Sequence, residues 1–256
     1  MILPMIKINR ENCPPSLNKP NANFRKDDVI EALLRMQHKK CCYCEAKLKK
    51  MGPRIKEVDH YIPRSAEEFK DKDGNIQEHQ ANRWTNLLYS CRNCNGVKFQ
   101  QHPYNKLTGE LELVDPSSEN TDPEVHIGFI LDGEYKAHDI RGKTLLGKTT
   151  CRILKFGERI DLISRFNTVS LEIDKCFTEL KDAIMFEENA DVEAKRKELS
   201  RLMSADCEFA GFCRAYIRMK LDKFNEKGIP FISGKLGKPL EVIKIYFPRK
   251  AETVGA

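Results

Sequence analysis

Two Cys-x-x-Cys pairs, Cys41 with Cys44 and Cys91 with Cys94, constrain the fold of this chain more than any other feature of its sequence. Each pair can present two thiolates to one ion, and four thiolates are a common ligand set for structural zinc. The 46 intervening residues exceed the spacing of an ordinary zinc ribbon. A shared Zn²⁺ would therefore hold together the two ends of a long insertion. Cys42 is a rival ligand, but Cys42-x-Cys44 has the wrong spacing, so we assign Cys41.

A closed four-thiolate site has no open coordination position, so its predicted role is to stabilise the fold. The first residues lack the apolar core of a secretory leader, and no run of 18 apolar residues suggests a membrane span. We therefore expect a cytoplasmic protein without membrane contact, whose ten cysteines are thiols or metal ligands and not disulfides. The cysteines outside the two pairs are predicted to be inert: Cys13, Cys151, Cys176, Cys207 and Cys213.

Between the two pairs lies Val58-Asp-His-Tyr-Ile-Pro-Arg-Ser65, and the second pair continues as Cys94-Asn-Gly-Val-Lys98. His60 can take a proton from water near neutral pH, as a general base must. Asp59 and Asn95 offer the oxygen ligands that Mg²⁺ or Mn²⁺ prefers. Such a cation neutralises phosphate charge, so the set suits hydrolysis of phosphodiesters.

Three further side chains complete the predicted site. Lys98 and Arg64 are expected to contact phosphates, and Asn86 is expected to hydrogen-bond to the loop after His60. The charge pattern agrees, because residues 38–106 hold 14 Lys and Arg against 8 Asp and Glu, which accounts for the whole net charge of +6. Such a basic segment is typical of a surface that meets a polyphosphate.

In this order of motifs, residues 38–106 resemble the HNH endonuclease family. The resemblance implies a ββα-metal core with His60 as general base, Asn86 organising the hairpin, and Asn95 with Asp59 binding the catalytic metal. Many relatives have histidine where Asn95 stands. An amide oxygen still binds Mg²⁺, but this departure makes tight Zn²⁺ or Ni²⁺ binding there less favourable.

A longer resemblance includes Met5-Ile-Lys-Ile-Asn-Arg10, Pro14-Pro15 and a helix that leads into Cys41-Cys-Tyr-Cys-Glu45. It is similar to the HNH nuclease subunit of the Septu anti-phage system, which also occurs with some retrons. This resemblance implies an ABC/SMC-like ATPase partner, a hetero-oligomer and action on nucleic acid, with DNA favoured over RNA. The helical C-terminal half would then be the docking surface.

Two other functions compete with the nuclease. One is a non-catalytic, zinc-held adaptor or nucleic-acid-binding module. The other is an ATPase, because Gly142–Thr149 fits the P-loop pattern G-x-x-x-x-G-K-[ST]. The polar residues before Gly142 argue against a buried P-loop strand, and we instead expect Thr149 or Thr150 to begin a helix.

The overall prediction is an α+β protein with three regions. Residues 1–37 form an arm followed by a helix capped by Asp27, residues 38–106 the HNH core, and residues 107–256 a mainly helical part. A connecting loop is expected at 107–123 and a short strand at 242–247. Two apolar stripes at helical spacing predict core packing or a partner interface: Val169, Ile173, Cys176, Phe177, Leu180 and Ile184, then Phe209, Phe212, Cys213, Tyr216, Ile217, Leu221 and Phe224.

Overall fold

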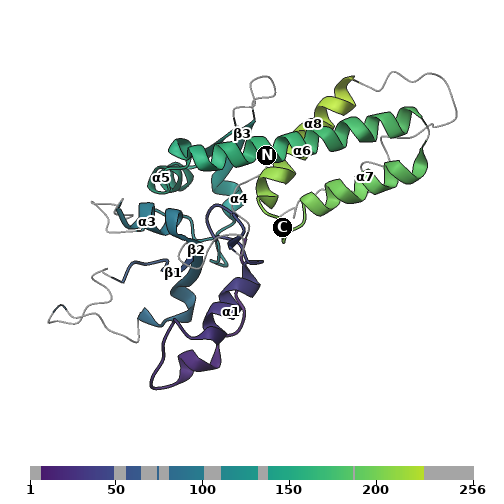
Figure 1. Ribbon diagram of the computed structural model, residues 1–256. Coiled ribbons are helices and arrows are strands. Elements are labelled where there is room, and N and C mark those ends of the chain that lie inside the picture. Colours follow the sequence, from purple (N-terminus) through teal and green to yellow (C-terminus); the bar gives the residue numbers. More distant parts are fainter. Residues whose placement is uncertain are drawn as a thin grey trace, which may run out of the picture.

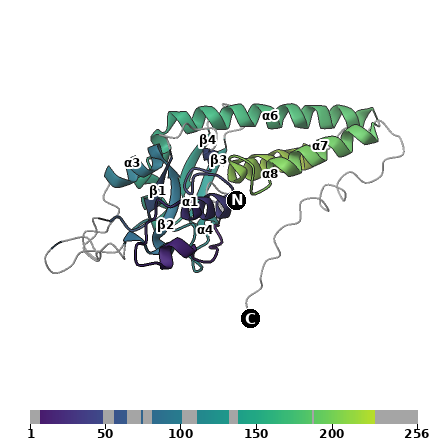
Figure 2. The ribbon, with the colours of Figure 1, turned by 60° about the horizontal axis from the view of Figure 1, so that its bottom comes forward.

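The computed structural model describes residues 7–48, 56–64, 74, 81–100, 111–131, 138–186 and 188–227. Within these ranges the fold is a mixture of helices and two small antiparallel sheets, so the α+β class is confirmed. A compact part holds both sheets, and helices α6, α7 and α8 extend from it as an arm (Figures 1 and 2).

The N-terminal segment before α1, which includes the 3-10 turn η1 (Pro15–Asn18), packs against the turn that precedes the second strand. Arg10 Nη1 donates to the carbonyl oxygens of Trp84 and Leu87 at 2.8 and 3.0 Å. Helix α1 (Asp27–Met36) lies where it was predicted. The predicted cap was wrong, because Lys26 is the N-cap residue and Asp27 already belongs to the helix.

The first sheet pairs β1 (Lys56–His60) with β2 (Leu87–Cys91), and α3 (Arg92–Gln100) follows β2 directly. The strands run antiparallel, with His60 opposite Leu87, and α3 contacts both of them. Because a helix begins where β2 ends, the second cysteine pair spans the strand end and the first helical turn. The 3-10 turn η4 (Trp84–Asn86) leads into β2.

The second sheet was not predicted. It pairs β3 (Ile127–Leu131), which follows the short helix α4 (Pro123–His126), with β4 (His138–Gly142). A usable signal existed, since the apolar run Ile127–Leu131 is followed by Asp-Gly, a dipeptide typical of hairpin turns.

The P-loop-like segment does not form a phosphate loop. Helix α5 (Leu145–Ile153) begins at the N-cap Thr144, whose side chain accepts from the Gly147 amide, so Gly147 lies in the first helical turn. The preceding strand β4 belongs to an antiparallel hairpin, whereas a P-loop follows a strand of a buried parallel sheet. The structure thus argues against the ATPase and also corrects the predicted helix start, which was Thr149 or Thr150.

Gly147 has a packing role that can be tested. A Cβ atom built there would lie 1.7 Å from the carbonyl oxygen of His126, so an alanine forces backbone apart. We expect Gly147→Ala to lower the free energy of unfolding by about 2–4 kcal/mol in urea titrations. The matched control is Gly96→Ala, where no atom lies within 4 Å, and that variant should be neutral or slightly stabilised. Equal stability of the two variants would contradict this account.

The C-terminal half is helical as predicted, with η5 (Phe156–Glu158), α6 (Ile160–Met185), α7 (Asn189–Leu202) and α8 (Ala210–Lys227). Its aromatic centre joins the helices to β3: Phe166 stacks on Phe212 at 4.7 Å between ring centroids, and Phe129 meets both rings edge-on. Both apolar stripes therefore contribute to the core, apart from Phe224, whose side chain lies outside the described part of the structure.

One cluster of buried apolar residues runs from Ile8 to Leu221 and includes both sheets. Glu45 ties the first cysteine pair to α8, since its backbone oxygen accepts from the Phe209 amide at 3.3 Å and its Oε2 from the Gly211 amide at 2.7 Å. The predicted boundary at 106 and the predicted strand at 242–247 lie outside the described residues.

Candidate functional site

The four paired cysteines come together in the interior. The Sγ atoms of Cys41, Cys44, Cys91 and Cys94 all lie within 4.8 Å of one another, and all four residues are buried. Tetrahedral zinc with about 2.3 Å bonds to sulfur separates its ligands by about 3.8 Å, and the Cys44 and Cys91 sulfurs are 3.9 Å apart. The cluster is therefore compatible with structural zinc.

The cluster contains Cys41 and not Cys42, in agreement with the choice made from the spacing, and ligation of zinc by Cys41 stays a prediction. The turn between Cys41 and Glu45 directs the two side chains differently. The Cys41 amide donates to the Ala46 carbonyl, whereas the Cys42 amide donates to the Tyr89 carbonyl of β2. Burial and the nearby sulfur of Cys41 raise the pKa of Cys42, which keeps its thiol protonated.

Arg159, just before α6, reaches the cysteine cluster from the helical half. Its Nη1 donates to Cys94 Sγ at 3.6 Å, and its other nitrogens hold both carboxylate oxygens of Asp161 at 2.7 Å. Four thiolates around a Zn²⁺ ion would carry a net charge of −2, so the guanidinium beside one sulfur would stabilise the site when zinc is bound. Outer-shell groups of this kind tune metal affinity.

We expect Arg159→Gln to weaken zinc retention about tenfold or more, since the neutral side-chain amide of glutamine cannot offset the thiolate charge. The measurement is zinc transfer to a chromogenic chelator. Arg152→Gln, which alters an exposed arginine of α5, is the control and should release zinc like the wild type. Identical transfer curves for the two variants would show that Arg159 serves only the fold.

Strand β1 and helix α3 face each other through two polar pairs. Asn95 Nδ2 donates to Glu57 Oε2 at 2.7 Å, and Lys98 Nζ donates to Asp59 at 2.7 and 2.9 Å. The periodicities explain the match, because residues two apart share a strand face and residues three apart share a helix face. Glu57 was not predicted as part of the site, although its position two residues before Asp59 could have indicated it.

The carboxylate of Asp59 is buried and fully engaged. Besides Lys98 it accepts from Tyr43 Oη at 2.5 Å, and Lys98 also donates to the His60 carbonyl at 2.6 Å. Lys98 is only 2% exposed. The structure thus places Lys98 as the partner of Asp59, and its predicted contact with phosphate remains a prediction.

The imidazole of His60 is held in one orientation. Its Nε2 lies 2.7 Å from the carbonyl oxygen of Ala81, and its ring meets Phe24 edge-on at 4.8 Å. A carbonyl only accepts, so Nε2 carries the proton and Nδ1 of the neutral ring keeps its lone pair. Burial lowers the pKa of His60, which favours the neutral ring.

Asn86 makes the contact that the sequence predicted. Its Oδ1 accepts from the Ile62 amide at 2.7 Å and its Nδ2 donates to the Ile62 carbonyl at 3.0 Å. These bonds fix the turn that follows His60. Arg64, further along the same turn, lies over the Phe24 ring at 5.7 Å.

One open cleft of about 350 Å³ gathers most of the predicted site. Asp59, His60, Arg64, Asn95 and Lys98 all line it, and Asn86 lies behind its wall as the support just described. The other lining residues are Val58, Pro63 and Phe99. Oxygen donors, an oriented imidazole and cations thus share one concave surface.

The fold and site define a mixed α+β protein with a buried four-cysteine cluster and a cleft lined by both charged and apolar side chains. No protein-family model matches the chain, and no solved structure matches it. Among curated proteins, the chain is similar to the Septu protein PtuB of Bacillus thuringiensis, at 30% identity over 166 residues. The alignment covers 60% of this chain and 55% of that protein, so this chain spans about half of its relative's length.

None of the described helices combines the length and the apolar character needed to span a membrane.

Proposed function

We propose that this chain is a metal-dependent HNH nuclease that hydrolyses phosphodiester bonds in nucleic acid. The observation that carries the proposal is the cleft in which His60 lies beside Asp59, Asn95 and Arg64. His60 has its proton on the Ala81 side, so Nδ1 is left to take a proton from the attacking water. Arg64 is the cation offered to the substrate backbone.

The catalytic cation would be Mg²⁺ or Mn²⁺, held by Asp59 and Asn95. The donor chemistry fits, because carboxylate and amide oxygens suit a hard cation. When bound, the ion would supply charge neutralisation at the phosphate. Asn95 Nδ2 is committed to Glu57, so its Oδ1 is the atom to offer. Asp59 shares its oxygens with Lys98, so binding of a cation requires Lys98 to give up part of that contact.

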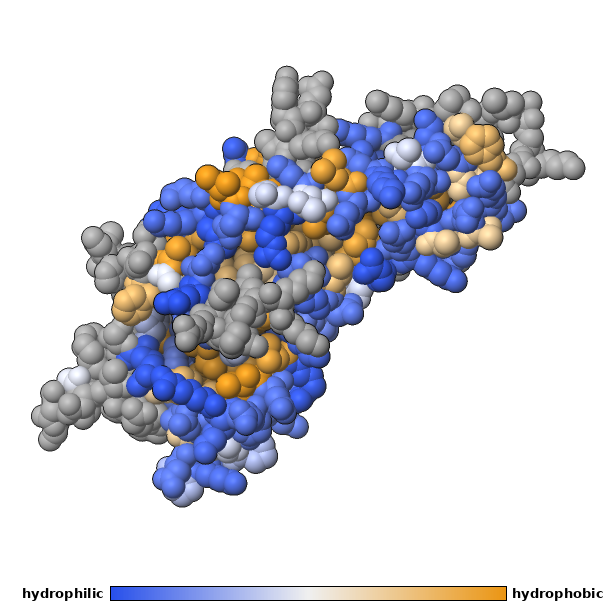
Figure 3. All heavy atoms as spheres, in the orientation of Figure 1, coloured by the Kyte–Doolittle hydropathy of each residue, from blue (hydrophilic) through white to orange (hydrophobic). Residues whose placement is uncertain are grey.

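We further propose that the nuclease is the effector of an anti-phage defence complex with an ABC/SMC-like ATPase. The similarity to a Septu protein supports this role. The arm of α6, α7 and α8 is the proposed docking surface. It is mostly hydrophilic on the face drawn in Figure 3, with paler orange at its far end. At the end of α6, Met185 and Phe186 are 52% and 70% exposed.

One observation favours a second candidate, a non-catalytic adaptor or nucleic-acid-binding module. The Asp59 carboxylate is already satisfied by Lys98 and Tyr43, as in a structural ion pair. A cleavage assay separates the two candidates. The purified chain, alone and with its co-expressed partner, is incubated with duplex DNA, single-stranded DNA and RNA. The nuclease requires cleavage that depends on Mg²⁺ or Mn²⁺, and binding without cleavage under all these conditions supports the adaptor.

A further inference from the structure

Two cysteines outside the metal cluster lie side by side. Cys207 is half-buried in the turn between α7 and α8, and Cys213 is fully buried in the first turn of α8. Both side chains line the same cavity, although five residues separate them in sequence, and the Cys213 thiol donates to the Glu208 carbonyl at 3.8 Å. Both were predicted to be inert because neither belongs to a Cys-x-x-Cys pair, and only the fold brings them together.

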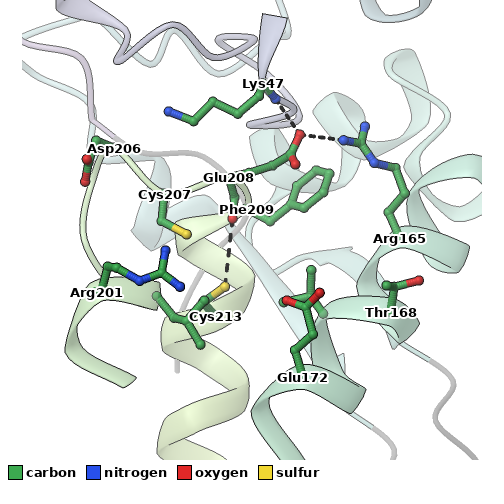
Figure 4. A pocket seen from close by; sticks show the side chains of 12 residues that line it. Lys47, Arg165, Thr168, Glu172, Arg201, Asp206, Cys207, Glu208, Phe209 and Cys213 are labelled. Atoms are coloured by element: carbon green, nitrogen blue, oxygen red, sulfur yellow. Dashed lines mark hydrogen bonds and ion pairs between the residues drawn. The ribbon is translucent and has the colours of Figure 1, made fainter. Parts of the chain in front are cut away.

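Both cysteines line a cavity of about 570 Å³, whose walls come from α6, α7, the start of α8 and Lys47. Figure 4 shows the Cys207 and Cys213 sulfurs turned toward each other, with the Arg201 guanidinium beside them. The cavity walls hold three basic residues, Lys47, Arg165 and Arg201, and three acidic ones, Glu172, Asp206 and Glu208, so the thiols lie in a polar surrounding. A small polar oxidant can therefore reach Cys207 through this cavity.

The two sulfurs have different protonation preferences. The neighbouring Cys213 thiol, aided by Arg201 and Lys40, lowers the pKa of Cys207 to about 7. The neighbouring Cys207 sulfur and burial raise the pKa of Cys213, which stays a thiol. An accessible thiolate beside a protonated thiol is the arrangement of an attacking and a resolving cysteine.

We propose that Cys207 and Cys213 form an oxidisable dithiol that reacts with a hydroperoxide to give an intramolecular disulfide. The Cys207 thiolate attacks one peroxide oxygen, an S–O bond forms, the O–O bond breaks, and the leaving oxygen takes up a proton as water or an alcohol. The Cys213 sulfur then attacks the Cys207 sulfur. The S–S bond forms, the S–O bond breaks, and the departing hydroxide takes the Cys213 proton as a second water. The dithiol loses two electrons and the peroxide gains them.

The disulfide would close a short loop, residues 208–212, which contacts the residues just after the first cysteine pair. Between the two sulfurs lie Glu208, which accepts from the Lys47 amide at 2.6 Å and pairs with Arg165, and Phe209, whose amide donates to the Glu45 carbonyl. Phe209 has a φ of +53°, so its backbone is already constrained. Oxidation would therefore change the contact between the start of α8 and the residues just after the first cysteine pair. This proposal goes beyond the nuclease and does not depend on it.

Peptide mapping tests the proposal on the wild-type chain. Trypsin releases residues 202–214, which contain Cys207 and Cys213 and no other cysteine, and residues 11–25, which contain only Cys13. The folded protein is treated with hydrogen peroxide, denatured, alkylated and digested. We expect peptide 202–214 to become two hydrogen masses lighter and resistant to alkylation. This oxidation should be about tenfold faster than the oxidation of Cys13, because the pKa of Cys13 is raised. Zinc content, measured in parallel, should stay constant.

Two controls separate a built site from ordinary thiol oxidation. In Cys213→Ser, Cys207 should accumulate as a sulfenic acid that a cyclic 1,3-dione traps. In wild-type protein unfolded in urea before treatment, the advantage over Cys13 should vanish. Equal reaction rates of the two peptides in the folded protein, or conversion of Cys207 to sulfinic acid without a disulfide, would overturn the proposal.

Discussion

Replacing Cys44 with serine is expected to unfold most of the molecule. All four sulfurs of the cluster lie within 4.8 Å of one another and are buried, so three remaining thiolates cannot complete a closed site. Structural zinc contributes about 10–16 kcal/mol of apparent binding energy in small domains, which is comparable with the whole stability of a globular protein. We expect a loss of at least about 5 kcal/mol, because a weakened three-ligand site retains part of the affinity.

The measurements are zinc content, with about one ion per chain expected in the wild type, and thermal unfolding with and without a chelator. Cys42→Ala is the matched control, since Cys42 is the adjacent buried cysteine outside the cluster. It should keep its zinc and lose only about 1 kcal/mol. A wild-type protein that contains no zinc and melts identically with and without chelator would disprove the structural metal.

His60→Ala is expected to lower the rate of phosphodiester cleavage by about 10²–10⁴-fold, the usual contribution of a general base. Among the described residues, His60 is the one histidine that lines the cleft. Substrate binding should persist, because Arg64 is unchanged. Rates are compared at saturating Mg²⁺ or Mn²⁺, below the unfolding temperatures of both proteins.

His126→Ala is the control, since His126 makes a hydrogen bond to Thr144 and does not line the cleft. It should cleave like the wild type. If His60→Ala retains full metal-dependent activity, the assignment of the base is wrong. If the wild type never cleaves, alone or with its partner, the adaptor is the better interpretation.

Local chemistry and spacing made several features predictable from the sequence. The cysteine pairs, the α1 helix and the apolar stripes of α6 and α8 all follow short-range patterns, and each is found in the structure. Asn86 was also predictable in its role, because a turn after β1 needs a side chain that can both donate to and accept from the backbone.

Long-range packing decided the rest. The sequence could not show that Lys98 is buried against Asp59, that Arg159 reaches Cys94, or that Cys207 meets Cys213. Each depends on how α3, α6 and α8 are docked, and docking is set by burial of apolar surface summed over many residues. By contrast, the clustering of the four paired cysteines was predictable from the sequence itself, because it depends on residue type and spacing. The partners of each charged or reactive group were decided only by the tertiary structure.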